Sequence, residues 1–226
     1  RINPHFKPGF ARDTIISQNY IGGFIAVKTD FLKIHKGMLE NLNKNFIYDL
    51  VLQISEKTRK IEHIQKILFH ELKKEMDIDI EDEKEIIEKH LNRVGLEYEN
   101  IQDGRFKGQY KVNYKIKGNP KVSIIIPSKD HIEDLDKLLK SIEKSTYSNY
   151  EIVIVENNSE SKETFEYYDK ISKQDERIKI VKFDITYFNY SSIVNFGVEN
   201  SSGEYVILLN NDIEFLTPDW IEEMLM

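Results

Sequence analysis

The chain has 226 residues, of which 40% are hydrophobic and 31% charged, a composition typical of a globular protein with one large domain or two small ones. Its formal net charge of −7 argues against a general nucleic-acid-binding protein, which would present a basic surface. The absence of cysteine excludes disulfides, thiolate metal sites and cysteine nucleophiles, and no apolar run approaches the ~20 residues that a membrane-spanning helix needs.

The first part of the chain, residues 1–74, mixes patterns of short helices and short strands. Its strand candidates are two apolar stretches, residues 23–27 and 61–69. Residues 75–93 are dominated by acidic residues and lysine. Their apolar residues recur at helical spacing until a glycine at position 95: Ile80, Ile86, Ile87, Leu91 and Val94. We interpret residues 75–118 as a solvated helical connector that ends in a strand at 108–116, where alternate residues are apolar.

From residue 119 onward, strand and helix patterns alternate. Apolar runs predict strands at 122–127, 150–155, 178–181 and 205–209. The segments between them have helical spacing at 135–142, 164–172 and 191–200. This alternation predicts an α/β fold with a mostly parallel sheet and flanking helices. In such sheets, ligands bind at the carboxyl ends of the strands.

Three polar clusters follow predicted strands and should therefore meet at one edge of the sheet. They comprise Pro127, Ser128, Lys129 and Asp130; Glu156, Asn157, Asn158 and Ser159; and Asn210, Asn211 and Asp212. Each cluster taken singly is explained by ordinary turn and cap residues. Their common placement after three strands predicts a ligand-binding site.

These clusters, with Asn195 and Gly197 before the last strand and Thr217 to Trp220 after it, resemble the family 2 glycosyltransferases. The resemblance implies a GT-A fold, Rossmann-like and here incomplete or permuted. It also implies a nucleotide-sugar donor, UDP- or dTDP-linked, and a glycan acceptor.

The same resemblance assigns roles to residues. Asp212 is the expected ligand of Mg²⁺ or Mn²⁺, which prefer oxygen ligands, although Asn210 replaces the first acid of the family's D-x-D motif. Glu156, where the family usually has Asp, is expected to accept a hydrogen bond from the base. The predicted nucleotide-binding residues are Pro127, Ser128, Asp130, Glu156, Asn158, Asn195, Asn210 and Asn211.

The N-terminal third resembles the distal, acceptor-binding half of the same family. The family places a Glu-Asp pair, its catalytic base, where this chain has Phe46 and Ile47, and neither of these can accept a proton. Asp49 matches a residue that starts a helix. His70 matches a histidine that completes the metal site, and a strand-end histidine without a ligand explains it equally well. No catalytic residue is therefore assigned.

The two halves occur in reverse order, which indicates a tandem array of glycosyltransferase units, of which this chain holds the end of one unit and the start of the next. The chain starts at Arg1 and stops at Met226 within a helical pattern, and we expect a piece of a longer protein. The expected parts are an acceptor-side half at 1–74, a connector at 75–118 and a nucleotide-sugar-binding half at 119–226. Either the halves pack as one permuted domain, with His70 near Asp212, or they form two half-domains.

The expected function is sugar transfer in surface polysaccharide synthesis, with the isolated chain inactive. The expected location is the cytoplasm, with the inner face of the membrane as an alternative that depends on the parent protein. The alternative is a degenerate module that binds a nucleotide-sugar or glycan, or serves as a scaffold. A sugar-nucleotide pyrophosphorylase would need a Gly-rich, Arg-containing loop after the first strand of the sheet. Lys129 and Asp130 stand there instead.

Overall fold

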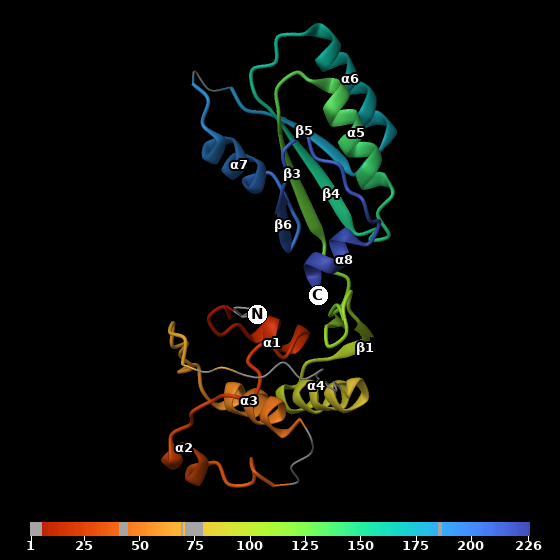
Figure 1. Cartoon of the computed structure of the whole chain (residues 1–226). Coiled ribbons are helices and arrows are strands. Elements are labelled where there is room, and N and C mark those ends of the chain that lie inside the picture. The colour runs from red at the N-terminus through yellow and green to blue at the C-terminus, as the bar shows by residue number, and fades with distance from the viewer. Residues whose placement is uncertain (1–5, 41–44, 69, 71–78, 185–186) are drawn as a thin grey trace. The chain divides into compact units, whose positions relative to one another are not determined.

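The computed structural model describes residues 6–40, 45–68, 70, 79–184 and 187–226. The chain divides into two compact units, Arg1–Lys115 and Ile116–Met226, which follow one another along the colour ramp of Figure 1. Among the described residues, no helix is both long enough and apolar enough to cross a membrane.

The first unit combines helices with one antiparallel strand pair. Its helices are α1 (Arg12–Ser17), α2 (Thr29–Ile34), α3 (Phe46–Lys57) and α4 (Ile80–Val94). Its strands are β1 (Tyr98–Asp103) and β2 (Tyr110–Tyr114), which pair with each other. The predicted helix at 80–94 and the predicted strand around 110–114 are both confirmed.

Helix α4 begins and ends at the residues that its sequence indicates. The Asp79 side chain caps its first turn by accepting a hydrogen bond from the Asp82 N–H, at 3.3 Å. Gly95 ends it in the left-handed conformation, with φ of 70°, where glycine has no steric penalty. Ile87 and Leu91 are fully buried in a cluster that includes residues of α1, α3 and β2. The stretch described above as a connector thus contributes to the core of the first unit.

Both strand predictions in the N-terminal third are wrong. Residues 24–28 and 61–65 have no regular secondary structure, and Phe69 lies outside the described residues. The side chains of Phe24, Ile64 and Ile67 are 58%, 62% and 76% exposed. An apolar stretch becomes a strand only when a neighbouring strand takes up its backbone hydrogen bonds. The described part of this unit offers neither stretch such a neighbour.

Four polar side chains link α3 to α4. Glu56 Oε1 lies 2.8 Å from His90 Nδ1 and 2.8 Å from Arg93 Nε, and the Glu56 and His90 side chains are each 7% exposed. Arg93 Nη2 also donates to Asp49 Oδ1 at 3.0 Å. This charge network supplements the apolar packing of the two helices.

The second unit is an α/β layer with a parallel four-stranded sheet, which confirms the predicted fold class. Its strands are β3 (Val122–Ser128), β4 (Tyr150–Glu156), β5 (Ile178–Lys182) and β6 (Tyr205–Leu208), in the order β5-β4-β3-β6. Its helices are α5 (Ile132–Glu143), α6 (Lys162–Gln174), α7 (Tyr190–Glu199) and α8 (Trp220–Leu225). Ser128 pairs with Glu156 and Ile125 with Leu208, so β3 and β4 end at the same level and β6 ends three residues below it.

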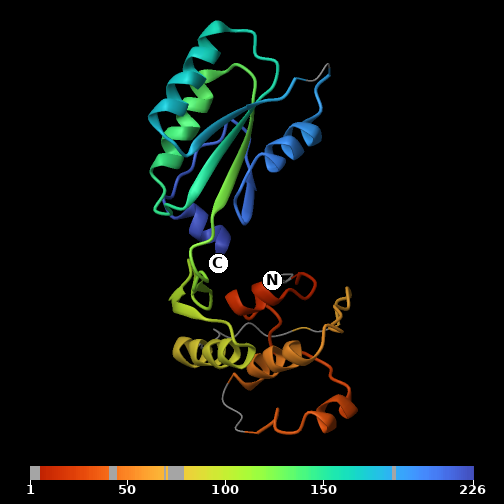
Figure 2. The ribbon, with the colours of Figure 1, turned by 180° about the vertical axis from the view of Figure 1, so that it is seen from behind.

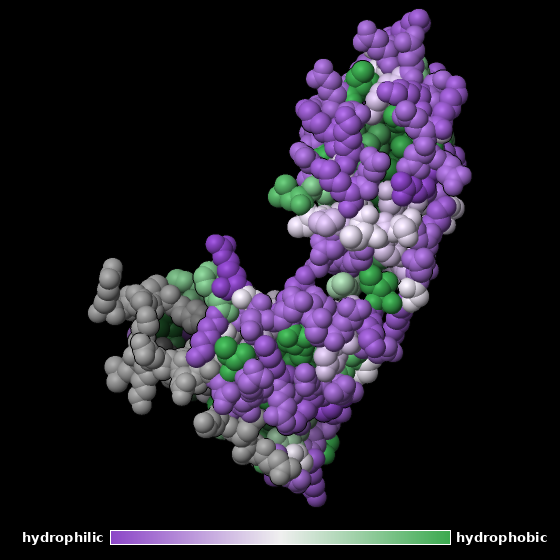
Figure 3. Space-filling model, turned by 90° about the vertical axis from the view of Figure 1, so that its right-hand side faces the viewer, coloured by the Kyte–Doolittle hydropathy of each residue, from purple (hydrophilic) through white to green (hydrophobic). Residues whose placement is uncertain are grey.

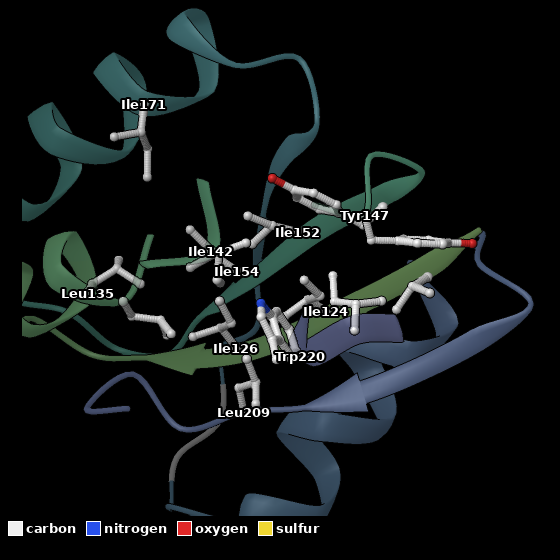
Figure 4. Packing of buried hydrophobic residues seen from close by; sticks show 14 of the residues in the cluster. Ile124, Ile126, Leu135, Ile142, Tyr147, Ile152, Ile154, Ile171, Leu209 and Trp220 are labelled. Carbon is white, nitrogen blue, oxygen red and sulfur yellow. The ribbon is translucent and has the colours of Figure 1, made fainter. Parts of the chain in front are cut away.

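Helices cover both faces of this sheet. Helices α5 and α6 lie on one face and α7 on the other, as the two opposite views show (Figures 1 and 2). On the first face, Ile124, Ile126, Ile152 and Ile154 point toward α5, and Trp220 packs beside β3 (Figure 4). The outward side of α5 and α6 is mainly hydrophilic (Figure 3), in keeping with an amphipathic helix layer.

Helix α7 approaches the second face closely because residue 197 has no side chain. A Cβ atom on Gly197 would lie 2.8 Å from Val155 Cγ2 and still closer to Ile125 Cγ2. Ile125, Val155 and Ile193 belong to the cluster under this helix. The helix-to-sheet distance here therefore depends on glycine.

At the opposite edge of the sheet, a half-buried carboxylate ties the start of β6 to β3 and β4. Glu151 accepts hydrogen bonds from Lys121 Nζ at 2.7 Å, from Ser123 Oγ at 2.6 Å and from the Ser202 N–H at 2.5 Å. Burial alone would raise the pKa of Glu151, but these donors outweigh it and lower the pKa to about 2.

We expect Glu151→Gln to destabilise the second unit by about 1–2 kcal/mol at pH 7, after allowance for solvent screening at the half-exposed lysine. The carboxylate has a lower pKa in the folded chain than its ordinary 4.5, so its stabilisation is complete above pH 4.5 and is lost between pH 4.5 and about 2. Urea unfolding followed by fluorescence of the single tryptophan, Trp220, measures this difference. A pH-independent difference would contradict the assignment, and Glu166→Gln, at an exposed ion pair, is the control.

Candidate functional site

The carboxyl edge of the sheet brings the predicted clusters of the second unit to one side of the molecule. Pro127 and Ser128 end β3, and Glu156 ends β4. Leu209 N–H donates to Ile125 O at 2.9 Å, so Asn210, Asn211 and Asp212 leave β6 beside the end of β3. Parallel strands put these ends on a common edge.

Ser128 is a buried link between this edge and α6. Its hydroxyl accepts a hydrogen bond from Tyr168 Oη at 2.9 Å, and its carbonyl accepts from the Asn157 N–H at 3.0 Å. Burial raises the pKa of Tyr168, so its hydroxyl remains a proton donor. Ser128 thus fixes the backbone at the end of β3.

Glu156 is the most unusual group at the edge. Only 1% of this residue is exposed. Its Oε1 atom accepts from the Ser159 N–H at 2.6 Å, whereas Oε2 is buried and accepts no hydrogen bond from the described residues. A buried polar atom without a partner costs about 1–3 kcal/mol, and such atoms in folded proteins call for an explanation. A ligand that donates to Oε2 would remove this cost.

Asp130, predicted to bind the nucleotide, has its carboxylate occupied by the protein. The carboxylate accepts from the Glu160 N–H at 3.2 Å, the Ser161 N–H at 3.1 Å and Thr164 Oγ1 at 3.0 Å. Burial would raise the pKa of Asp130, but these hydrogen bonds outweigh it and hold the pKa below its ordinary value. Asp130 therefore caps the start of α6 as an ionised side chain.

Other predicted residues are more open. Asn158 is exposed, with φ of 57° in the left-handed region that asparagine tolerates. Asn195 is exposed on α7. Asn210 and Asp212 are exposed, and Asn211 is half-buried.

Asp212 lies in a loop that is anchored on both sides. Leu209 before it is buried. After it, Phe215 stacks on Trp220 with ring centroids 3.6 Å apart, and its N–H donates to Ser141 Oγ at 3.2 Å. The loop thus holds an exposed carboxylate close to a rigid core.

The donor chemistry fits a cation only in part. Among the described residues, no group of three or more His, Asp or Glu side chains could hold a metal ion. Mg²⁺ is commonly held by one or two carboxylates together with substrate phosphates. Asp212 fits as one such ligand, with the amide oxygens of Asn210 and Asn211 as neutral neighbours in sequence.

The residues predicted in the first unit are not brought into a site within that unit. His70 is exposed, in a stretch without regular secondary structure. Asp49 lies in the first turn of α3, as expected of a helix-start residue, and is engaged by Arg93 and by Gln53 Nε2, the latter at 2.9 Å.

Sequence reasoning missed Tyr168 and Thr164 as partners of the edge residues. Ser161 at the N-cap of α6 was a readable signal, because serine there commonly accepts a hydrogen bond from the first turn. The links from Asp130 to Thr164 and from Ser128 to Tyr168 span 34 and 40 residues, and no local pattern predicts them.

Comparison with known proteins gives one family match, to the model described as "Glycosyl transferase family 2", over residues 123–226. This range covers the whole sheet of the second unit except its first residue, Val122.

Two curated relatives are similar along almost the whole chain. The "Uncharacterized protein y4gI" of Sinorhizobium fredii is 30% identical over 236 residues, covering 99% of this chain and 26% of that protein. The "O-antigen biosynthesis protein RfbC" of Myxococcus xanthus is 32% identical over 234 residues, covering 99% of this chain and 18% of that protein. The chain thus spans about a quarter or less of these relatives.

Among solved structures, the mannosyltransferase PcManGT of Pyrobaculum calidifontis, in complex with GDP-Man and Mn²⁺, aligns with a TM-score of 0.41 at 18% identity. The alignment covers 46% of this chain and 31% of that one.

Proposed function

We propose that this chain is part of a glycosyltransferase that transfers a sugar from a nucleotide-sugar to a carbohydrate acceptor in surface polysaccharide synthesis. The family match over residues 123–226 supports the reaction class. The similarity along 99% of the chain to an O-antigen biosynthesis protein supports the type of product.

One observation carries the assignment of the donor site: the buried Glu156 Oε2 has no hydrogen-bond partner among the described residues and lies on the same sheet edge as Asp212. A uracil or thymine ring offers an N–H donor that would satisfy Oε2. In this proposal the backbone of Pro127 and Ser128 lies against the base and ribose, and the sheet is the nucleotide-binding part of a GT-A fold.

The diphosphate of the donor is negatively charged, and so is this chain, which has a formal net charge of −7. Asp212 would hold Mg²⁺ or Mn²⁺ together with the diphosphate oxygens. A divalent cation bound there neutralises the charge that develops on the leaving diphosphate. The exposure of Asp212 leaves it open to solvent and to a ligand.

We expect UDP to bind weakly in the presence of Mn²⁺, and Asp212→Ala to weaken this binding about tenfold or more, since tenfold corresponds to ~1.4 kcal/mol. Calorimetric titration of UDP with and without Mn²⁺ measures the effect. Glu214→Ala removes an exposed acid two residues away and should leave the affinity unchanged. Equal affinity in all these cases would refute the donor site.

A second function, that of a degenerate binding or scaffolding module, is favoured by one feature of the first unit. Phe46 and Ile47 stand at the start of α3, and Asp49 is held in an ion pair with Arg93. We propose that this unit supplies no catalytic base and that the chain by itself is inactive. UDP binding separates a binding module from a scaffold. Turnover of a nucleotide-sugar by the longer parent protein separates an enzyme from a binding module.

A further inference from the structure

A carboxylate that is to accept a hydrogen bond from a ligand in a fixed direction must itself be held in place. One oxygen of the Glu156 carboxylate is already fixed by the protein. Oε1 accepts from the Ser159 N–H at 2.6 Å, closing a turn over residues 156–159. This short hydrogen bond orients the carboxylate and leaves Oε2 buried, with no hydrogen bond from the part of the chain that the structure describes. The position of Oε2 therefore depends on the position of Ser159.

Ser159 is in turn held from the neighbouring strand end. The Asp130 N–H donates to Ser159 Oγ at 3.0 Å. The Asp130 carboxylate takes up the next two backbone N–H groups, of Glu160 and Ser161, and the Thr164 hydroxyl. Asp130 thus binds the turn after β4 through both its backbone and its side chain.

The backbone at this place is unusual for residues other than glycine. Asp130, His131 and Asn158 all have positive φ, of 50°, 52° and 57°. Such conformations cost about 1 kcal/mol or more each and persist only where surrounding contacts impose them. The hydrogen bonds of Asp130 link these two strained segments to each other.

We propose that Asp130 is a positioning residue for base recognition: it does not touch the nucleotide but holds the 156–161 turn so that Glu156 Oε2 accepts a hydrogen bond from the ring N–H of a uracil-type base. This inference rests on the proposed donor site. It replaces the direct nucleotide contact expected from the sequence with an indirect role.

The test compares two ligands that differ at the ring N–H. UDP carries this donor at N3, and 3-methyluridine 5′-diphosphate lacks it. Calorimetry in Mn²⁺ gives the ratio of their affinities for the full chain. We expect a preference for UDP of about tenfold in the unaltered chain, the effect of one buried acceptor left without its donor.

Asp130→Ala should reduce this preference to about twofold while leaving the affinity for the methylated ligand nearly unchanged. Asp130→Asn keeps an acceptor for Ser161 and Thr164 and should retain most of the preference. Trp220 fluorescence during urea unfolding confirms that each variant is folded. If only the alanine variant is unfolded, the positioning role is decided on two other variants. The ratio of the affinities for UDP and for the methylated ligand is then compared between Asp130→Asn and Thr164→Val.

The outcomes separate the two claims. If Asp130→Ala weakens both ligands by the same factor, Asp130 supports the fold only and the positioning role is overturned. If the unaltered chain itself shows no preference for UDP over the methylated ligand, the contact of Glu156 with the base is wrong, and the donor site fails together with this inference.

Discussion

Gly197→Val is expected to destabilise the second unit by about 2–4 kcal/mol, because the added side chain has no space between α7 and the sheet. A Cβ atom alone would overlap side-chain methyl groups of Ile125 and Val155, both of which are in strands of the sheet. Neither residue can move without disturbing β3 or β4, since the interior is close-packed. Urea unfolding followed by Trp220 fluorescence measures the loss of stability. Trp220 is only 6% exposed in the folded chain, so its environment changes on unfolding.

Asn195→Val is the matched control for this substitution. It introduces the same β-branched residue into the same helix at an exposed position, so it carries only the small helix-propensity cost of valine. We expect a change within ~0.5 kcal/mol. If both variants lose the same stability, the close approach at Gly197 is not what holds α7 on the sheet.

The strands of the second unit could be predicted from the sequence because its buried strands are continuous apolar runs. The predicted strand at 122–127 and the observed β3, Val122–Ser128, differ by one residue at the end. The placement of the polar clusters at a common edge then followed from the parallel topology alone. The sequence could thus predict which residues reach the carboxyl edge.

The chemistry at that edge was less readable. Asp130 was expected to face the nucleotide, yet its carboxylate is taken up by N–H groups 30 and 31 residues away. Which acid is used internally and which retains an unpartnered oxygen depends on loop conformation. Positive φ at Asp130 and Asn158 sets that conformation, and neither residue type requires it.

In the first unit, apolar content misled the strand predictions. Ile64 and Ile67 have the composition of a strand but remain largely exposed. The acidic helix α4, in contrast, contains a buried histidine at position 90. Burial of His90 depends on Glu56 of α3, 34 positions earlier, and no spacing within α4 indicates that partner.

Glu56→Ala is expected to destabilise the first unit by about 2–3 kcal/mol, because it leaves His90 and Arg93 without their shared acceptor. The Glu56 and His90 side chains are each 7% exposed, so water can replace the lost carboxylate only poorly. Arg93 is 33% exposed and keeps Asp49 as a partner, which limits the loss. Hydrogen exchange of α3 and α4 amides measures the effect within the first unit, which has no tryptophan.

Glu85→Ala is the control on α4, since it removes an exposed ion pair with Lys89, and exposed pairs contribute little. We expect amide protection in α3 and α4 to fall by about thirtyfold or more for Glu56→Ala, the equivalent of ~2 kcal/mol, and to change less than about threefold for Glu85→Ala. Equal protection in the two variants would mean that apolar packing of Ile87 and Leu91 alone holds the helices together. In that case the buried charge network would contribute nothing to the stability of the unit.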